Sequence, residues 1–217
     1  RRLARAARRR GPLHALRVLR DRIDDHIASR RLGMNPAGLI PIETLVPHWQ
    51  DCHDYFPSMI GHVRRVLDAL AIGPGDVFVD YGAGMGRTLA LAAAYPFERI
   101  IGVEIAPSLI AVARQSLRRA VPPHRLGAIE LWEGNAADYR LPDDATVVYL
   151  YNPFHGSILR GVLADIRRSL DAAPRRMAVI VHNPRHFAPI AHDYPWLRCV
   201  RTFEFEYECR VLEAVSA

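Results

Sequence analysis

The sequence has no lysine, few cysteines and no long apolar run. All 29 of its basic residues are arginine, and its cysteines are an odd, scattered set of three, Cys52, Cys199 and Cys209, which does not suggest a disulfide framework. No apolar run reaches the roughly 18 residues typical of a membrane-spanning helix, and no signal-like segment is present. The histidines and cysteines do not follow metal-ligand spacing. These absences favour a cytoplasmic protein without a membrane partner or a bound metal.

The composition is that of one folded domain. The chain has 217 residues, half of them hydrophobic, and a mean hydropathy of −0.03, so it can bury a full core. Residues 33–48 contain several prolines and glycines and indicate a linker. We therefore expect an arginine-rich helical extension and linker in residues 1–54 and one α/β domain in residues 55–217.

Positive charge is concentrated at the N-terminus. Eight arginines and no acid occur in residues 1–20, although the net charge of the chain is only +6. Such an arm can bind nucleic-acid phosphates, but the missing lysine can also reflect a general preference for arginine. Apolar residues recur at helical spacing and predict an amphipathic helix over residues 12–29 that packs on the domain or on a second subunit; they are Leu13, Leu16, Leu19, Ile23 and Ile27. We favour packing, with a homodimer through this helix possible, over a nucleic-acid partner.

The most informative segment is residues 77–87, VFVDYGAGMGR. A β-branched and aromatic run ends in Asp80, three glycines follow, and the alanine- and leucine-rich residues 88–95 predict a helix. This is the beginning of a βαβ unit. The glycines permit a ligand to approach the backbone more closely than a Cβ atom would allow.

The spacing of this turn indicates the ligand. A dinucleotide-binding turn has Gly-x-Gly-x-x-Gly, but here the third glycine comes one residue early and Arg87 follows it. Asp80 would repel a pyrophosphate and would suit an ammonium group. S-adenosylmethionine carries positive charge on its sulfonium and its amino group, and residues 55–217 resemble the class I methyltransferases.

This resemblance implies a set of cofactor contacts. Glu104 ends the predicted second strand, residues 99–104. It lies 24 residues after Asp80, close to the roughly 20-residue interval after the first strand at which an acid meets ribose hydroxyls. Asn135 and Ala136 follow the third strand, where the side-chain oxygen would accept from the adenine amine and the Ala136 amide would donate to the ring. The full set of expected cofactor-binding residues is Tyr55, Ser58, Asp80, Tyr81, Gly82, Ala83, Gly84, Gly86, Arg87, Glu104, Ile105, Asn135, Ala136 and Asn152.

The predicted fourth strand, residues 145–151, ends at Tyr151-Asn152-Pro153-Phe154. This sequence resembles the turn of amine-directed methyltransferases, in which the asparagine oxygen accepts from the target nitrogen. The expected catalytic residues are Asn152, Tyr151 and Phe154. Methyl transfer is a displacement at carbon, so Asn152 would orient a neutral amine and would not deprotonate it. The nucleic-acid enzymes usually have two prolines here, and this chain has one.

A narrower resemblance is to the lysine methyltransferases without a SET domain, of the disruptor-of-telomeric-silencing type, and their small prokaryotic relatives. Tyr55-Phe56-Pro57-Ser58, the glycine turn and the Asn-Pro-Phe turn carry it, and it implies that Tyr55 and Ser58 belong to a lid. Met85 stands where the family often has a polar residue. The expected activity is methylation of a protein lysine or a small amine. The alternatives are methylation of a small-molecule oxygen or carbon and non-catalytic binding of S-adenosylmethionine.

The resemblance also implies the fold. We expect a Rossmann-like three-layer sandwich with a mostly parallel seven-stranded sheet, an antiparallel C-terminal hairpin and the N-terminal helical extension. The last strands are predicted at residues 178–182, 197–205 and 206–214, with helices at 57–70, 157–171 and 186–191. Right-handed crossovers would then place the glycine turn, Glu104, Asn135 and Asn152 along one edge of the sheet.

Overall fold

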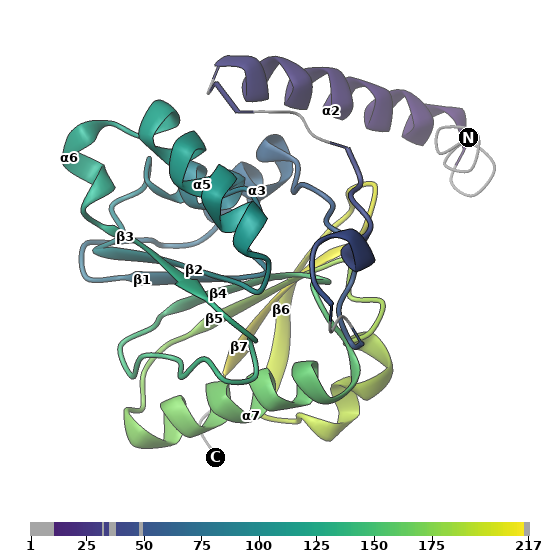
Figure 1. The fold of residues 1–217 in the computed structure, drawn as a ribbon. Coiled ribbons are helices and arrows are strands. Elements are labelled where there is room, and N and C mark those ends of the chain that lie inside the picture. The colour runs from purple at the N-terminus through teal and green to yellow at the C-terminus, as the bar shows by residue number, and fades with distance from the viewer. Residues whose placement is uncertain (1–10, 32, 35–37, 48–49, 215–217) are drawn as a thin grey trace.

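A seven-stranded sheet forms the centre of the protein (Figure 1). The computed structural model describes residues 11–31, 33–34, 38–47 and 50–214. The strand order is β3-β2-β1-β4-β5-β7-β6, with β1 to β5 parallel and β7 antiparallel to both of its neighbours. This confirms the expected fold class. The strands are β1 (Val77–Tyr81), β2 (Arg99–Glu104), β3 (Ile129–Glu133), β4 (Val147–Tyr151), β5 (Ala178–His182), β6 (Leu197–Phe203) and β7 (Cys209–Ala214).

Helices cover both faces of the sheet (Figure 1). One face carries α3 (Ile60–Leu67), α4 (Arg87–Ala92), α5 (Pro107–Ala120) and the short α6 (Pro123–Leu126), and the other carries α7 (Gly156–Ala172) and the 3₁₀ helix η2 (Ala188–Asp193). The central strands are buried on both sides, as their continuous apolar runs require. Two apolar cores result, one on each side of the sheet.

Three predicted elements differ in extent. The helix expected at residues 57–70 is the shorter α3, and the one at 186–191 is the 3₁₀ helix η2. The last two strands pair, but they are shorter than predicted, because residues 204–208 form a loop between them. Phe205 in this loop is buried and stacks on the His62 ring with centroids 4.0 Å apart. The burial of Phe205 fixes this loop, and the ladder between β6 and β7 ends at Phe203 and Cys209.

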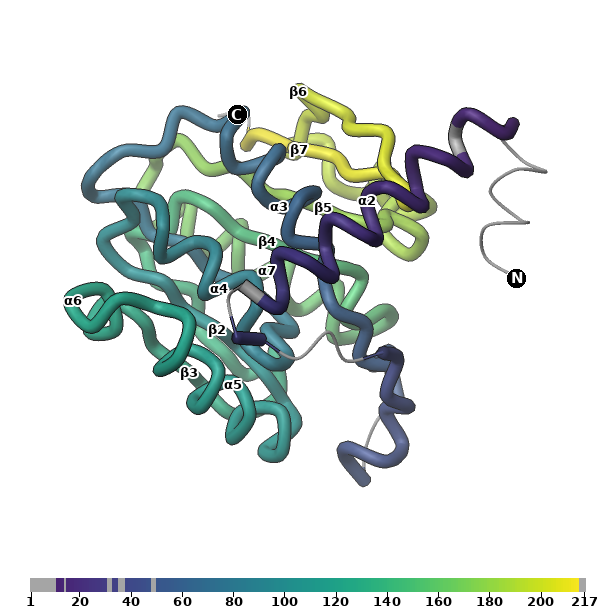
Figure 2. Tube along the Cα trace, turned by 90° about the horizontal axis from the view of Figure 1, so that it is seen from above, coloured from purple at the N-terminus to yellow at the C-terminus, as the bar shows by residue number. Residues whose placement is uncertain are grey.

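The N-terminal helix α2 (Pro12–Arg31) forms as predicted, but its apolar face does not pack on the domain. A different face docks instead: Val18 is buried, Arg22 pairs with Glu206 at 2.7 Å and Asp21 with His62 at 3.2 Å. Figure 2 shows α2 crossing the molecule beside α3. The predicted packing face is solvent-exposed in this chain, at 40% to 80% of each side chain, and consists of Leu13, Leu16, Leu19, Ile23 and Ile27.

The segment expected to be a linker is folded against the domain in its described part. It contains the 3₁₀ helix η1 (Ile42–Thr44), and Ile42 and Val46 are buried against the start of α5. An isolated bridge joins Ile40 to Tyr55, and a second one joins Cys52 to Phe154 in the β4–α7 turn. We call residues 50–58 the lid segment. The linker prediction was wrong because proline and glycine content says nothing of tertiary packing.

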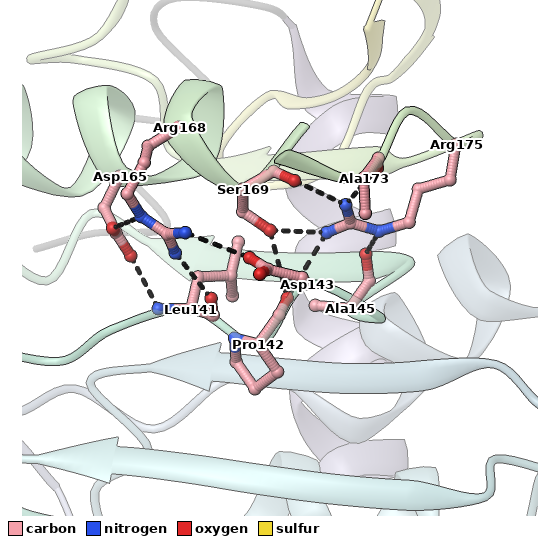
Figure 3. A network of polar contacts seen from close by, with 9 residues as sticks. All are labelled: Leu141, Pro142, Asp143, Ala145, Asp165, Arg168, Ser169, Ala173 and Arg175. Atoms are coloured by element: carbon pink, nitrogen blue, oxygen red, sulfur yellow. Dashed lines mark hydrogen bonds and ion pairs between the residues drawn. The ribbon is translucent and has the colours of Figure 1, made fainter. Parts of the chain in front are cut away.

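A polar network fixes α7 to the loop that precedes β4 (Figure 3). Arg175 donates to the carbonyl oxygens of Ala145, Ser169 and Ala173 at 2.7 to 2.9 Å. Arg168 donates to the Leu141 carbonyl at 2.7 Å and pairs with Asp165 and Asp143. These contacts satisfy backbone carbonyls at the C-terminal end of α7. The network therefore ties the C-terminal end of α7 to the loop that leads into β4.

We expect Arg175→Ala to lower the free energy of unfolding by roughly 2 to 4 kcal/mol, because several carbonyl acceptors lose their donor at once. The neighbouring Arg176 has one ion pair, with Glu213 at 3.3 Å, and a 64% exposed side chain. Arg176→Ala is the matched control and should change the stability little. Urea unfolding at pH 7 measures both variants. Equal effects of the two would mean that the network does not stabilise the fold.

Candidate functional site

A cavity of about 570 Å³ lies at the carboxyl ends of the parallel strands. This is where ligands bind in open α/β sheets. Its wall combines the turn after β1, the end of β2, the turns after β3, β4 and β5, and the lid segment. The predicted site residues that line it are Tyr55, Ser58, Gly82, Ala83, Arg87, Glu104, Ile105, Asn135, Ala136, Tyr151, Asn152 and Phe154.

The glycine turn is closely covered by two other loops. Gly82 and Gly84 have φ values of 81° and 55°, in the left-handed region. A Cβ atom on Gly82 would lie 2.5 Å from Pro153, and one on Gly84 would lie 2.3 Å from the Tyr55 ring. Only glycine fits at either position. The glycine turn, the β4–α7 turn and the lid segment thus form one packed unit.

Asp80 is buried beneath this turn and 2% exposed. It accepts a hydrogen bond from the Thr88 side chain, and Thr88 lines the cavity. Burial raises the pKa of the Asp80 carboxyl to about 8, with a smaller contribution from the charge of Glu104. Asp80 therefore lies one layer behind the cavity wall rather than on it.

Glu104 is the acid on the cavity wall. Its Oε2 accepts from the Gly84 amide at 2.8 Å and its Oε1 accepts from the Ala106 amide at 3.0 Å. Burial raises the pKa of the Glu104 carboxyl, while these amides oppose the rise. Each carboxylate oxygen can accept a further hydrogen bond. Glu104 can thus meet two hydroxyl donors while it holds the glycine turn in place.

Arg87 connects the cavity to α2. Its Nη2 donates to Asp25 at 2.8 Å and 3.0 Å and to the Ser29 hydroxyl at 2.7 Å. Its Nε and Nη1 atoms are buried and have no hydrogen-bond partner among the described residues. The side chain is 4% exposed and lines the cavity. A buried cation with two free donors is suited to an anionic ligand group.

The turn after β3 differs in detail from its prediction. Gly134 has a φ of 155°, and Asn135 lines the cavity. The Asn135 side-chain oxygen accepts from the Ala137 amide at 3.0 Å, so this oxygen has one acceptor position left for a ligand.

The turn after β4 carries the predicted catalytic residues. Asn152 has a φ of 46°, a left-handed conformation that asparagine tolerates better than most residues. Tyr151 stacks on His182 with ring centroids 4.3 Å apart, and Phe154 is buried. The lid segment fixes this turn: His53 donates its amide to the Pro153 carbonyl at 3.0 Å. Asp51 accepts from the amide and the hydroxyl of Ser157 at 2.8 Å and 2.6 Å, at the start of α7.

Four predicted cofactor residues do not line the cavity: Asp80, Tyr81, Gly84 and Gly86. Tyr81 alternates with Asp80 along β1 and points to the α7 side, where it is fully buried near Tyr139 and Phe154. Its side chain therefore faces away from the cavity. Gly84 is covered by Tyr55, and Gly86 packs against α5.

The structure adds residues that the sequence reasoning missed. Asn183 and Arg185 follow β5 and line the cavity. His53 also lines it, in a group with His155 and His186 whose ring centroids are 4.7 to 5.1 Å apart. Burial and the neighbouring imidazoles lower the pKa of His53 to about 4. The repeated Asn-Pro pair at 183–184 was a signal in the sequence, but nothing in it showed that the lid brings His53 to this place.

No helix in residues 11–31, 33–34, 38–47 and 50–214 is long and apolar enough to cross a membrane. The same part of the chain holds no group of three or more His, Cys, Asp or Glu side chains able to hold a metal ion.

The residues present fit S-adenosylmethionine. Gly82 gives the close backbone approach, Glu104 offers acceptors for hydroxyls, and the free donors of Arg87 can meet a carboxylate. In the turn after β3, the amide of Ala136 and the second acceptor position of Asn135 can meet the adenine. Together these groups match the nucleoside and amino-acid parts of that molecule.

Comparisons with known proteins agree with this fit. Residues 78–173 match the model of a methyltransferase-domain family, and no curated protein matches the sequence. One similar solved structure is an RNA methyltransferase from Salinibacter ruber in complex with S-adenosyl-L-homocysteine. It is 23% identical, with a TM-score of 0.54, over 74% of this chain and 95% of that one.

Two further structures share the fold. A S-adenosylmethionine-dependent methyltransferase from Aquifex aeolicus is 16% identical with a TM-score of 0.55, over 70% of this chain and 89% of that one. A precorrin 8w decarboxylase from Methanobacterium thermoautotrophicum is 18% identical with a TM-score of 0.56, over 82% of this chain and 96% of that one. Residues 78–173 are thus similar to a methyltransferase domain, and the chain has the fold of these solved structures.

Proposed function

We propose that the protein methylates the nitrogen of an amine. The observation that supports this most is Asn152, whose amide side chain lines the cavity beside the glycine turn and has no described hydrogen-bond partner. A side-chain carbonyl oxygen can accept from an N–H group and so direct the nitrogen lone pair away from itself. Tyr151 and Phe154 would form the wall beside it.

The cofactor-binding roles follow from the same geometry. The amino-acid carboxylate of S-adenosylmethionine would bind the free Nε and Nη1 donors of Arg87. Its ribose hydroxyls would donate to Glu104, and its adenine would contact Asn135 and Ala136. Asp80 would attract the ammonium group of S-adenosylmethionine electrostatically, without direct contact, because Thr88 lies between Asp80 and the cavity. Tyr55 and Ser58 of the lid segment would exclude water. When bound, S-adenosylmethionine supplies an electrophilic methyl group on a sulfonium.

The low basicity of His53 favours an amine over a hydroxyl as acceptor. A hydroxyl must lose its proton to a base during transfer, whereas a neutral amine already has a free lone pair. His53 has a pKa lowered to about 4 and is therefore a weak base. Alignment and exclusion of water are then the main contributions of this site.

Several acceptors share this chemistry. A protein lysine, in keeping with the resemblance to the non-SET lysine methyltransferases, and a small primary amine are the two that we propose. Exocyclic amines of RNA bases are a second candidate, because one similar structure is an RNA methyltransferase. Six of the N-terminal arginines, which would favour RNA, lie outside the described residues.

We expect Asn152→Gly to lower methyl transfer by about 100-fold or more, because the target nitrogen loses its alignment. Glycine removes the side chain and keeps the left-handed backbone without strain. The assay follows radiolabelled methyl uptake from S-adenosylmethionine into poly-L-lysine, small primary amines and total RNA. Calorimetric affinity for S-adenosylhomocysteine should stay unchanged. Unaltered uptake in the variant would refute the role of Asn152, and binding without uptake in the native protein would favour a non-catalytic binding protein.

The remaining expectations about partners stay predictions. A homodimer through α2 has an available surface, since the apolar stripe of that helix is exposed. The cytoplasmic location and the division at residue 55 are likewise untested. The lid segment and η1 line the cavity together with the main domain, so the N-terminal part contributes to the site wherever the boundary is drawn.

A further inference from the structure

Two equivalent turns lie side by side at the acceptor end of the cavity. Asn152-Pro153 follows β4 and Asn183-Pro184 follows β5. The strands are parallel neighbours, and their last paired residues are Tyr151 and His182. The two asparagines are therefore the next positions in register, on strands about 4.8 Å apart. Both line the cavity.

Both asparagines have the same unusual backbone. Their φ values are 46° and 55°, and only one other described non-glycine residue, Asp51, has a positive φ. Asn183 is fixed by its main chain, since its amide donates to the Glu208 carbonyl and its carbonyl accepts from the Arg185 amide, each at 2.7 Å. Its side chain, like that of Asn152, has no hydrogen bond among the described residues. A turn alone would explain one such asparagine before a proline, but not two unpartnered amides that share a cavity.

We propose that Asn183 is a second acceptor for the methyl-accepting nitrogen and that the site selects a primary amine. This rests on the proposed N-methylation. A primary amine has two N–H donors, and two oxygens that accept from one nitrogen lie roughly 5 Å apart, a separation that adjacent parallel strands provide. With both N–H groups directed to Asn152 and Asn183, the lone pair has one remaining direction, toward the methyl group.

The reaction balances without a further reactant. The nitrogen lone pair forms the new bond to the methyl carbon, the carbon–sulfur bond breaks, and its electron pair stays on sulfur as the neutral thioether. The nitrogen becomes a secondary ammonium, which can lose one proton to water. The two amide oxygens stabilise this positive charge as it develops.

The test uses sinefungin, a cofactor analogue that has a primary amine where S-adenosylmethionine has its methylated sulfonium. In the proposed binding mode this amine would point toward Asn152 and Asn183. S-adenosylhomocysteine, which lacks the amine, is the reference ligand. Titration calorimetry of the full chain gives the affinity ratio of the two ligands. The variants are Asn183→Gly, which keeps the backbone conformation without the amide, and Asn183→Asp, which keeps an acceptor oxygen.

We expect Asn183→Gly to reduce the sinefungin affinity by about tenfold, as for loss of a hydrogen bond to a charged group, with S-adenosylhomocysteine binding unchanged. Asn183→Asp should restore the preference for sinefungin. An unchanged affinity ratio in Asn183→Gly, or an equal loss for both ligands, would overturn the proposal. If the native protein binds neither ligand, the cofactor assignment itself fails, which is a separate result.

Discussion

Asp80→Asn is expected to raise the stability of the protein at pH 8 and to weaken its binding of the cofactor. The Asp80 carboxyl is buried, with a pKa raised to about 8 from the ordinary 3.8. The folded state therefore holds the proton more tightly than the unfolded state. The stability contributed by this proton is fully present below pH 3.8 and is lost as the pH rises to about 8. Asparagine does not titrate and escapes that loss.

The gain should amount to several kcal/mol above pH 8, because one pKa unit corresponds to about 1.4 kcal/mol. Urea unfolding at pH 5 and pH 8 measures it, with the exposed Asp138→Asn as the control. The ionised carboxylate is the form that attracts an ammonium, so the native affinity for S-adenosylhomocysteine should rise from pH 6 to pH 8 and the variant should lack this rise. A parallel pH dependence of the two proteins would contradict the role of Asp80.

Arg87→Met is expected to have two separable effects. It leaves the largely buried Asp25 without its partner and should cost about 3 kcal/mol of stability. The double variant Arg87→Met/Asp25→Asn removes both charges and should recover most of that loss, since asparagine still accepts from the Ile60 amide, which donates to Asp25 at 2.8 Å. Neither variant should recover the recognition of a carboxylate.

Two ligands separate recognition from stability. S-adenosylhomocysteine carries the amino-acid carboxylate, and methylthioadenosine has the same nucleoside without it. In both variants the affinity for the first should fall at least tenfold, while the second binds as in the native protein. Equal losses for both ligands would show that Arg87 only supports the fold around the cavity.

The cofactor side of the site could be predicted because its signals are local. Glycines that need a positive φ, an acid at a strand end and β-branched strands each leave a trace within a few residues of sequence. Parallel topology then places these segments at one edge. The family resemblance implied the mostly parallel seven-stranded sheet and its antiparallel C-terminal hairpin, and the structure confirms both.

The rest depends on contacts between distant segments. The apolar spacing of α2 predicted the helix, but the face that docks was decided by partners in other elements, among them Glu206, His62 and Arg87. In the same way, Tyr81 and Asp80 are adjacent in sequence and differ only in the side of β1 to which they point. Local patterns do not contain the packing of the lid segment on Phe154, so His53 could not be assigned to the cavity beforehand.

The attachment of the lid segment to the β4–α7 turn has a consequence for the order of events in turnover. Asp51 and His53 of the lid bond to Ser157 and Pro153, which flank the turn that presents Asn152. A lid that opens far enough to exchange the nucleoside must break these bonds and dismantle the surface that receives the acceptor. We therefore expect a compulsory sequence, in which the cofactor enters before the acceptor and the methylated product leaves before the spent thioether.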